Sequence, residues 1–248
     1  MNFKDLFSGH SDLYLTARPH YPDALFAWLA DEAPARARAW DAGCGNGQAS
    51  VALARYFQRV IATDPSEKQI GNAVADSRVE YRSEAAEHTS IADHSVDAVT
   101  VAQALHWFDL PAFIAEVRRV ARPGALFAAW CYAHCSVTPA VDGVIAQLYD
   151  PILGPYWSPE RRLVDEGYAS LEIPFTPVTA PAFEMRVDWN ARQLLAYLTS
   201  WSAAQKYFKA TGKDAVASIA GELVAAWGDP GQVQPVCWNL AIRAGRVE

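Results

Sequence analysis

Short apolar runs alternate with helical patterns between about residue 36 and residue 132. An apolar run bounded by turn residues predicts a buried strand, whereas apolar residues spaced three and four apart predict a helix. The strands predicted in this way cover residues 37–42, 59–63, 78–82, 96–102 and 125–131, and the helices cover 49–57, 66–74 and 111–120. Right-handed crossovers between parallel strands place helices on both faces of a sheet, so this alternation predicts a doubly wound, mostly parallel α/β sheet.

The two ends of the chain depart from this rhythm. A helix that begins at a proline is expected over 22–30, within an opening segment 1–35 that we interpret as a lid. Prolines interrupt the pattern after residue 132, so we expect 133–182 to form a helical cap. The remainder, 183–248, has strand patterns over 183–189 and 234–243 and helical patterns over 191–199 and 214–227. If both strands join the core formed by 36–132, the sheet has seven strands and is Rossmann-like.

Composition and charge narrow the class of protein. The chain has 248 residues, 51% of them hydrophobic, which suits a folded α/β protein and excludes intrinsic disorder. Acidic residues outnumber basic ones by 28 to 21, and a net charge of −7 argues against a nucleic-acid partner. No apolar run is long enough for a membrane span and the start lacks a secretory signal, so we expect a cytoplasmic protein without a membrane partner.

The four cysteines are scattered through the sequence. Such spacing in a chain without a secretory signal favours free thiols over a disulfide framework. Cys131 and Cys135 flank His134, but no second pair of ligands follows at a spacing typical of zinc sites. We therefore expect no metal site.

A glycine-rich loop follows the first predicted strand and contains Gly43, Gly45 and Gly47. Residues without a Cβ atom adopt positive φ easily and let a ligand approach the backbone closely, so the loop predicts a cofactor site. The dinucleotide fingerprint would require glycine at position 48, where the chain has Gln48. Asp41, two residues before the loop, would meet a cation better than a pyrophosphate, which favours a nucleoside cofactor that carries an amine.

A second acid, Asp64, ends the second predicted strand. In doubly wound sheets an acid at this position accepts hydrogen bonds from ribose hydroxyls. Taken together with the glycine loop, Asp64 is a candidate for binding the ribose of that nucleoside.

These motifs combine with others along the chain. The strings that matter are Asp41-x-Gly43-x-Gly45-x-Gly47, Asp64, Ser95-Val96-Asp97-Ala98-Val99, Arg119-Val120-Ala121-Arg122-Pro123-Gly124 and Gln103-Ala104-Leu105-His106-Trp107-Phe108. Together they resemble the class I S-adenosylmethionine-dependent methyltransferases of type 11, and the last string is similar to the trans-aconitate methyltransferase-like branch that acts on small molecules. The resemblance implies S-adenosylmethionine as cofactor, with Gln103 near it. It also implies an adenine-binding pair at Ala86 and Glu87, although the chain reads Glu84-Ala85-Ala86-Glu87 where the family often has Asp-Ala-Glu.

The end of the fourth strand is the expected place of the chemistry, because ligands of doubly wound sheets bind beyond the carboxyl ends of the strands. His106 could accept a proton or, as an imidazolium, hold a carboxylate. The faces of Trp107 and Phe108 could attract a sulfonium by a cation–π interaction. We therefore take His106 and Trp107 as candidate catalytic residues and Phe108 as a candidate substrate contact.

Residues outside the core complete the expected site. Tyr14 and Arg18 in the opening segment are expected to cover the cofactor, Tyr14 beside the reacting atoms and Arg18 on a carboxylate. The cap supplies an aromatic and cationic substrate pocket whose candidate residues are Tyr156, Trp157, Arg161 and Trp201.

The sequence therefore predicts a methyltransferase that moves a methyl group from S-adenosylmethionine to an oxygen or nitrogen atom of a small molecule by in-line displacement. Three alternatives stay open. The chain could be an NAD(P)-dependent oxidoreductase, an inactive cofactor-binding sensor or partner subunit, or a nucleic-acid methyltransferase, since one fold serves many functions.

Overall fold

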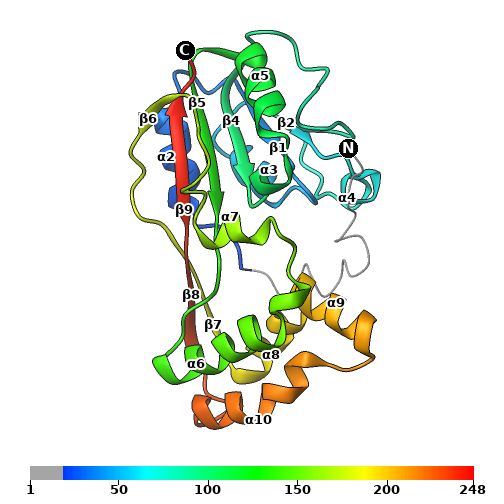
Figure 1. Cartoon of the computed structure of the whole chain (residues 1–248). Coiled ribbons are helices and arrows are strands. Elements are labelled where there is room, and N and C mark those ends of the chain that lie inside the picture. The colour runs from blue at the N-terminus through cyan, green and yellow to red at the C-terminus, as the bar shows by residue number, and fades with distance from the viewer. Residues whose placement is uncertain (1–18) are drawn as a thin grey trace.

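We describe a computed structural model of the chain, whose described residues are 19–248. Figure 1 shows a sheet with its helices in the upper part and a mainly helical lobe below it. Strands β5 and β9 run along the sheet toward this lobe, so the chain passes between the two parts several times.

The sheet has seven strands in the order β3-β2-β1-β4-β5-β9-β6. Strands β1 to β5 pair in parallel, whereas β9 is antiparallel to both β5 and β6. The bounds are β1 Arg38–Ala42, β2 Arg59–Thr63, β3 Val79–Arg82, β4 Val96–Ala102, β5 Ala121–Cys131, β6 Thr176–Val178 and β9 Ala241–Arg246. The predicted seven-stranded, mostly parallel sheet is thus confirmed. Strands β1 to β4 lie within one residue of their predicted bounds, whereas β5 begins at Ala121, before the predicted start at residue 125.

Helices cover both faces of this sheet. On one face α2 (Asp23–Glu32) and α3 (Gln48–Leu53) bury Leu25, Phe26 and Leu53 against the strands. On the other face α5 (Leu110–Val120) buries its apolar side in a separate cluster. The side chain of Asp109 accepts a hydrogen bond from the backbone of α5 and caps its first turn. The short α4 (Glu67–Gly71) is capped by Ser66, whose side chain accepts a hydrogen bond from the backbone N–H of Gln69.

The lower lobe is built from segments on both sides of β6. Its elements are α6 Pro139–Gln147, a π-helical turn η2 Leu148–Ile152, a 3-10 turn η3 Gly154–Tyr156, β7 Glu184–Trp189, α8 Ala191–Thr199, α9 Ser202–Thr211, α10 Ala215–Trp227 and β8 Gln234–Asn239. Strands β7 and β8 form a two-stranded antiparallel sheet of their own. The short α7 (Arg161–Asp165) packs against the 3-10 turn η1 (Leu105–Trp107) at the bottom of the core.

Two predictions about the sheet edge are wrong. The expected strand 183–189 does not join the main sheet, and the expected strand 234–243 is two strands, β8 and β9, separated at Leu240. The sixth sheet strand instead comes from 176–178, inside the expected cap, where backbone pairing with β9 overrides the weak local pattern around Pro177. Helix α9 was not predicted at all, because many of its side chains are exposed and it has little apolar pattern.

Candidate active site

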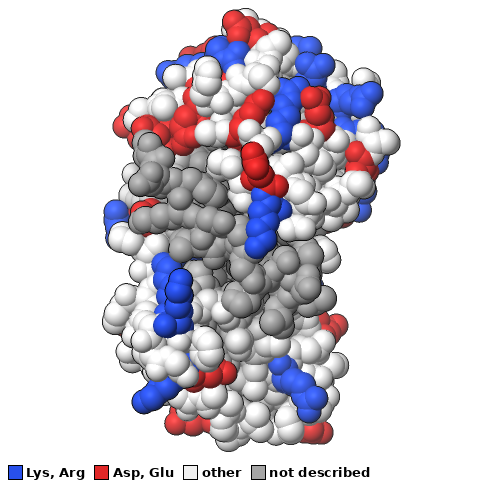
Figure 2. Space-filling view, turned by 90° about the vertical axis from the view of Figure 1, so that its right-hand side faces the viewer, with Lys and Arg blue, Asp and Glu red and all other residues white. Residues whose placement is uncertain are grey.

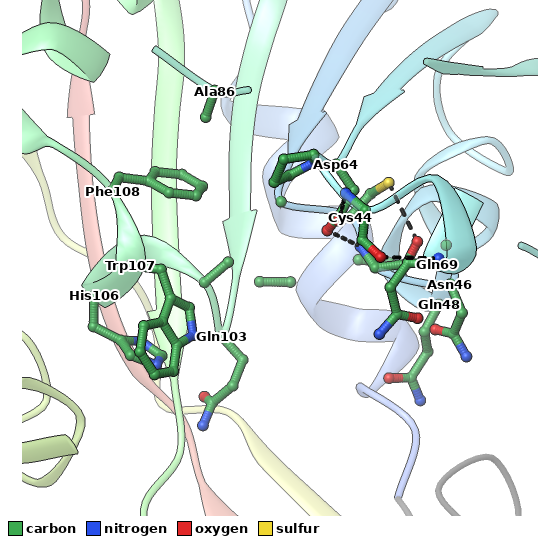
Figure 3. A pocket seen from close by; sticks show the side chains of 18 of the residues that line it. Cys44, Asn46, Gln48, Asp64, Gln69, Ala86, Gln103, His106, Trp107 and Phe108 are labelled. Atoms are coloured by element: carbon green, nitrogen blue, oxygen red, sulfur yellow. Dashed lines mark hydrogen bonds between the residues drawn. The ribbon is translucent and has the colours of Figure 1, made fainter. Parts of the chain in front are cut away.

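A cavity of about 1040 Å³ lies between the carboxyl ends of β1, β2 and β4 and the helical lobe. The core side contributes the glycine loop, the segment after β2, residues 85–87 and the segment after β4. The lobe side contributes aromatic and polar residues from 132 to 202. Figure 3 shows the segment with His106, Trp107 and Phe108 facing the segments that carry Cys44 and Asp64. The cavity therefore lies where the sequence placed the site.

The glycine loop adopts the conformation that its sequence predicts. Gly43, Gly45 and Gly47 have φ values of +68°, +55° and +84°. A Cβ atom on Gly43 would lie 2.7 Å from the Cβ of Ala104, and one on Gly47 would lie 2.1 Å from the hydroxyl oxygen of Tyr81. Among residues 19–248, apart from the chain neighbours of Gly45, no atom lies within 4 Å of the place where Gly45 would carry a Cβ. Two glycines thus allow close packing of the loop onto the protein, while the backbone of Gly45 borders open space.

Asp64 is held at the mouth of this loop. Its Oδ2 accepts a hydrogen bond of 2.9 Å from the backbone N–H of Gly45, and its Oδ1 accepts one of 2.9 Å from that of Ser66. A carboxylate has about four acceptor positions, and these two bonds fix the orientation of the Asp64 side chain. The same side chain lines the cavity, and its contact with a ribose stays a prediction.

Asp41 does not contact the cavity, which corrects the expectation that it would meet a cationic ligand. The side chain is fully buried beneath the loop, where Ser50 donates a hydrogen bond of 2.6 Å to Oδ2 and Thr100 donates one of 3.3 Å to Oδ1. Burial raises the pKa of Asp41 to about 7, although both hydrogen bonds lower it. Asp41 therefore supports the loop from below, by linking β1 to α3 and β4.

Gln103 lines the opposite wall, but its amide is engaged with the backbone. Its Nε2 donates to the carbonyl of Tyr132 at 3.0 Å, and its Oε1 accepts from the N–H of Tyr132 at 2.8 Å. Gln103 has a φ of +57°, a conformation that is rare for a residue with a side chain. This paired arrangement fixes the ends of β4 and β5 beside the cavity.

Ala86 and Glu87 both line the cavity on the core side. Ala86 is buried, whereas an oxygen of Glu87 accepts a hydrogen bond of 2.9 Å from the backbone N–H of Asp109. Glu87 therefore fixes the beginning of α5 relative to the cavity wall, and the pair stays a prediction for adenine binding.

His106 is mostly buried in η1, and its ring lies 4.7 Å from that of Trp107. Nδ1 of His106 lies 3.0 Å from the hydroxyl oxygen of Tyr168. Burial, assisted by the positive charge of Arg161 and opposed by Glu160, lowers the pKa of His106 to about 4. The lowered pKa favours the neutral imidazole near pH 7 in the chain without a ligand, and the role of His106 stays a prediction.

Phe108 lies against the glycine loop rather than on the lobe side. Its ring reaches 2.9 Å from the place of a Cβ on Gly43 and packs edge-on to Phe113 at 4.8 Å. It still lines the cavity, as does Trp107. The structure thus brings Phe108 close to the predicted cofactor loop, while its contact with the substrate stays a prediction.

The lobe side forms an aromatic cluster around one guanidinium. The carbon Cζ of Arg161 lies 4.9 Å from the ring centre of Trp157 and 5.5 Å from that of Tyr149. Its Nε donates to Asp165 and to the hydroxyl of Tyr149, each at 2.9 Å. The rings of Trp157 and Trp201 are 5.6 Å apart. Trp157, Arg161 and Trp201 all line the cavity.

Tyr156 is the exception among the cap residues. It packs against Tyr207, with ring centres 5.1 Å apart, and is absent from the lining of the cavity. The expectation that Tyr156 binds substrate is therefore wrong, because its ring fixes η3 to α9 instead. Tyr14 and Arg18 lie outside the described residues.

The sequence interpretation missed Tyr149 and Tyr168, which touch Arg161 and His106 respectively. Neither belongs to a motif, and only the folded chain brings them to the site. Within residues 19–248, no three side chains of the metal-binding types converge. Over the same residues, every helix is too short or too polar to cross a membrane.

Comparisons with known proteins agree with this geometry. A family model described as a methyltransferase domain matches residues 40–129. A methyltransferase of Dictyostelium discoideum is 36% identical over 231 residues, which are 91% of this chain and 87% of that protein. A solved structure from Anaeromyxobacter dehalogenans, described as a type II methyltransferase, is 50% identical with a TM-score of 0.88, covering 93% of this chain and 98% of that one. The similarity thus extends from the glycine-loop core through the helical lobe.

Proposed function

Because the chain belongs to the class I S-adenosylmethionine-dependent methyltransferases, we propose that it transfers a methyl group to an oxygen or nitrogen atom of a small molecule. The observation that carries this proposal is the single cavity shared by the glycine loop and the aromatic lobe. A methyl donor on one wall and an acceptor on the other would meet in it, as in-line displacement requires.

The residues of the core wall fit S-adenosylmethionine, the cofactor of this family. The backbone of Gly45 borders open space, and Asp64 is oriented to accept hydrogen bonds from a ribose. Trp107 and Phe108 present aromatic side chains to the same cavity, where they can attract a sulfonium with about 0.5–2 kcal/mol. When bound, the cofactor supplies a methyl group made electrophilic by positively charged sulfur.

The size and chemistry of the cavity support a small acceptor. Ligand pockets span about 300–1,000 Å³, and a cavity of about 1040 Å³ that must also hold the cofactor leaves room for a molecule of modest size. The lobe wall offers Trp157 and Trp201 for apolar contact and Arg161 for a polar anchor. These residues would hold the acceptor in line and exclude water, so that proximity supplies most of the rate enhancement.

The surface charge also favours a small-molecule substrate over a nucleic acid. On the face shown in Figure 2, acidic and basic side chains are interspersed rather than gathered into a basic patch. The chain as a whole has a net charge of −7. A phosphate backbone prefers a positive surface, so we propose a small-molecule partner and no nucleic-acid partner.

The proposal is tested by measuring S-adenosylhomocysteine formation with a panel of small carboxylic acids, phenols and amines, with transfer RNA as a separate arm. Turnover with a small acceptor, abolished by omitting that acceptor, is the expected result. Turnover only with the nucleic acid would overturn the small-molecule assignment. Cofactor binding in a thermal-shift titration without turnover on any acceptor would identify a cofactor-binding protein that is not an enzyme.

A further inference from the structure

The contact between His106 and Tyr168 determines what His106 can do in the cavity. The two side chains come from η1 and from the turn after α7, and they meet through Nδ1 and the phenol hydroxyl at 3.0 Å. Tyr168 is fully buried, whereas His106 lines the cavity. The pair therefore links a buried hydroxyl to a side chain that can touch a ligand.

The backbone holds Tyr168 in place from two sides. Gly167 and Tyr168 both have positive φ, +60° and +61°, and for a bulky residue this is an outlier. A Cβ on Gly167 would lie 2.8 Å from the Cβ of Ala241 in β9, so the turn fits closely against the sheet. Arg243 donates a hydrogen bond of 3.2 Å to the backbone carbonyl of Tyr168. The sheet thus fixes the position from which the hydroxyl reaches His106.

The numbers of donors and acceptors in this pair determine which tautomer of His106 is present. A phenol hydroxyl has one hydrogen to donate, and a neutral imidazole has one nitrogen that donates and one that accepts. Among the described residues, Nδ1 of His106 is the one acceptor within hydrogen-bonding distance of the Tyr168 hydroxyl. If Nδ1 carried the proton, the buried hydroxyl would be left without an acceptor, which is unfavourable. The hydroxyl of Tyr168 therefore donates to Nδ1, and the ring proton of His106 is on Nε2.

The charge state and the neighbours of His106 agree with this assignment. Burial and the charge of Arg161 lower the pKa of His106, so the ring stays neutral although the carboxylate of Glu160 acts in the opposite direction. Arg161 lines the same cavity, and its helix packs on η1. Its Nε is engaged with Asp165 and Tyr149, which orients the guanidinium. His106 and the guanidinium of Arg161, which is ion-paired with Asp165, thus line one cavity together with Glu160.

We infer that Tyr168 is a positioning residue that holds His106 as a neutral Nε2–H donor, and that His106 and Arg161 together bind an anionic oxygen of the acceptor molecule. The inference rests on the proposed function, which it deepens by naming the class of acceptor. In this arrangement His106 does not remove a proton from the nucleophile, because Nδ1 accepts from Tyr168 and Nε2 already carries a proton. Anionic oxygens suit such a site, since a charged acceptor makes the stronger hydrogen bonds.

The tautomer can be read directly by nitrogen-15 NMR of the full chain labelled at histidine, with the His106 signals assigned by their loss in His106→Gln. We expect a protonated Nε2 and an unprotonated Nδ1 near pH 7. In Tyr168→Phe, which keeps the ring and removes the hydroxyl, we expect the two tautomers to mix. A protonated Nδ1 in the unaltered chain would overturn the inference. Because this measurement needs no turnover, its result is independent of whether the methyl acceptor is a small molecule.

The binding half of the inference is tested with benzoate and the neutral benzamide, titrated in the presence of S-adenosylhomocysteine. Benzoate is expected to shift the His106 Nε2–H signal and to bind at least about 10-fold more tightly than benzamide, with the difference lost in Arg161→Gln. Equal binding of the two probes, or no binding of benzoate, would overturn the anionic-oxygen site.

Turnover with the best acceptor of the panel distinguishes whether His106 acts as a hydrogen-bond donor or as a general base. His106→Gln keeps an N–H donor but no base, so we expect it to stay within about 10-fold of the unaltered chain in kcat/KM, while His106→Ala loses about 10- to 100-fold. Equal losses in both variants at unchanged thermal stability would show that the proton-accepting capacity matters and would overturn the inference.

Discussion

The two walls of the cavity are built in different ways. The core wall consists largely of backbone and short side chains from one stretch of sequence, and the methyltransferase family model matches this stretch. The lobe wall consists of aromatic and polar side chains, among them Arg161 and Glu160, which come from separated segments between residues 132 and 202. The comparison teaches that the wall proposed to bind the cofactor is encoded locally, whereas the wall proposed to bind the acceptor depends on how the lobe folds back on the core.

The walls also differ in the charge that they bury. Under the core wall, burial raises the pKa of Asp41 from 3.8 to about 7. Near the lobe wall, burial and Arg161 lower the pKa of His106 from 6.5 to about 4. Folding favours the neutral form of both groups. Neutral Asp41 stabilises the folded state at low pH, whereas neutral His106 stabilises it at high pH.

The largest expected effect is therefore a pair of opposite pH dependences of stability. The folded state holds the Asp41 proton more tightly than the unfolded state, so this contribution is complete below pH 3.8 and is lost as pH rises through about 7, by roughly 4 kcal/mol. The contribution of neutral His106 is complete above pH 6.5 and is lost as pH falls through about 4, by roughly 3 kcal/mol.

Urea unfolding between pH 4 and 8 measures both contributions. In Asp41→Asn the free energy of unfolding should rise more steeply with pH than in the unaltered chain, and in His106→Gln it should rise less steeply or fall. Curves that run parallel for all three proteins would show that neither group has a shifted pKa.

The next largest effect is expected in the glycine loop. Gly43→Ala puts a Cβ 2.7 Å from Ala104 and 2.9 Å from Phe108, whereas Gly45→Ala, at a similar positive φ, meets no atom of the described residues within 4 Å except its chain neighbours. Both variants carry the backbone strain of about 1–2 kcal/mol, and Gly43→Ala adds overpacking of about 1–3 kcal/mol. Chemical denaturation should therefore show that Gly43→Ala is the less stable, and equal stability would mean that the close packing on Gly43 is relaxed in solution.

Asp64→Ala tests the core wall by affinity rather than stability. Loss of charge-assisted hydrogen bonds to the ribose should weaken S-adenosylmethionine binding by about 1–3 kcal/mol in calorimetric titration. The partly buried Asp76 is a suitable control, because it bonds to the nearby Arg78 and does not line the cavity. Unchanged cofactor affinity in a folded Asp64→Ala variant would exclude the ribose assignment.

The smallest effect is expected on the lobe wall. Trp157→Phe replaces the ring that packs against the guanidinium of Arg161 by a smaller one. Binding of the acceptor should therefore weaken by about 1 kcal/mol, seen as a higher KM, while cofactor affinity is unchanged. Tyr156→Phe, next in sequence but outside the cavity, serves as the matched control and should leave the KM unchanged. A loss of cofactor affinity in Trp157→Phe would mean that the two walls do not act separately.

The same contrast explains what the sequence could predict. The strands and helices around the first five strands were predictable because each follows a local pattern, and the three loop glycines have the positive φ values expected of them. The sheet edge was not, because β6 is short and the pairing of β9 with both β5 and β6 joins residues far apart in sequence. The length and apolarity of a segment alone do not determine which strand pairs at the edge of the main sheet.

For the site, the motif residues Gly45, Asp64 and His106 were found because the type of residue already indicates the chemistry. Asp41 was misplaced because a sequence shows that a carboxylate is near a loop but not on which side of it the carboxylate lies. Tyr168 has no motif, and its contact with His106 spans 62 positions of sequence.

The position of β6 has a consequence for exchanging acceptor specificity between relatives. The lobe consists of two stretches of chain, before and after Thr176–Val178, and this strand is paired with β9 in the sheet. A chimaera that transplants the lobe must therefore carry both stretches together and leave the strand between them behind. It must also keep glycine at position 245, where a Cβ would come within 2.8 Å of Phe175 at the junction of the graft.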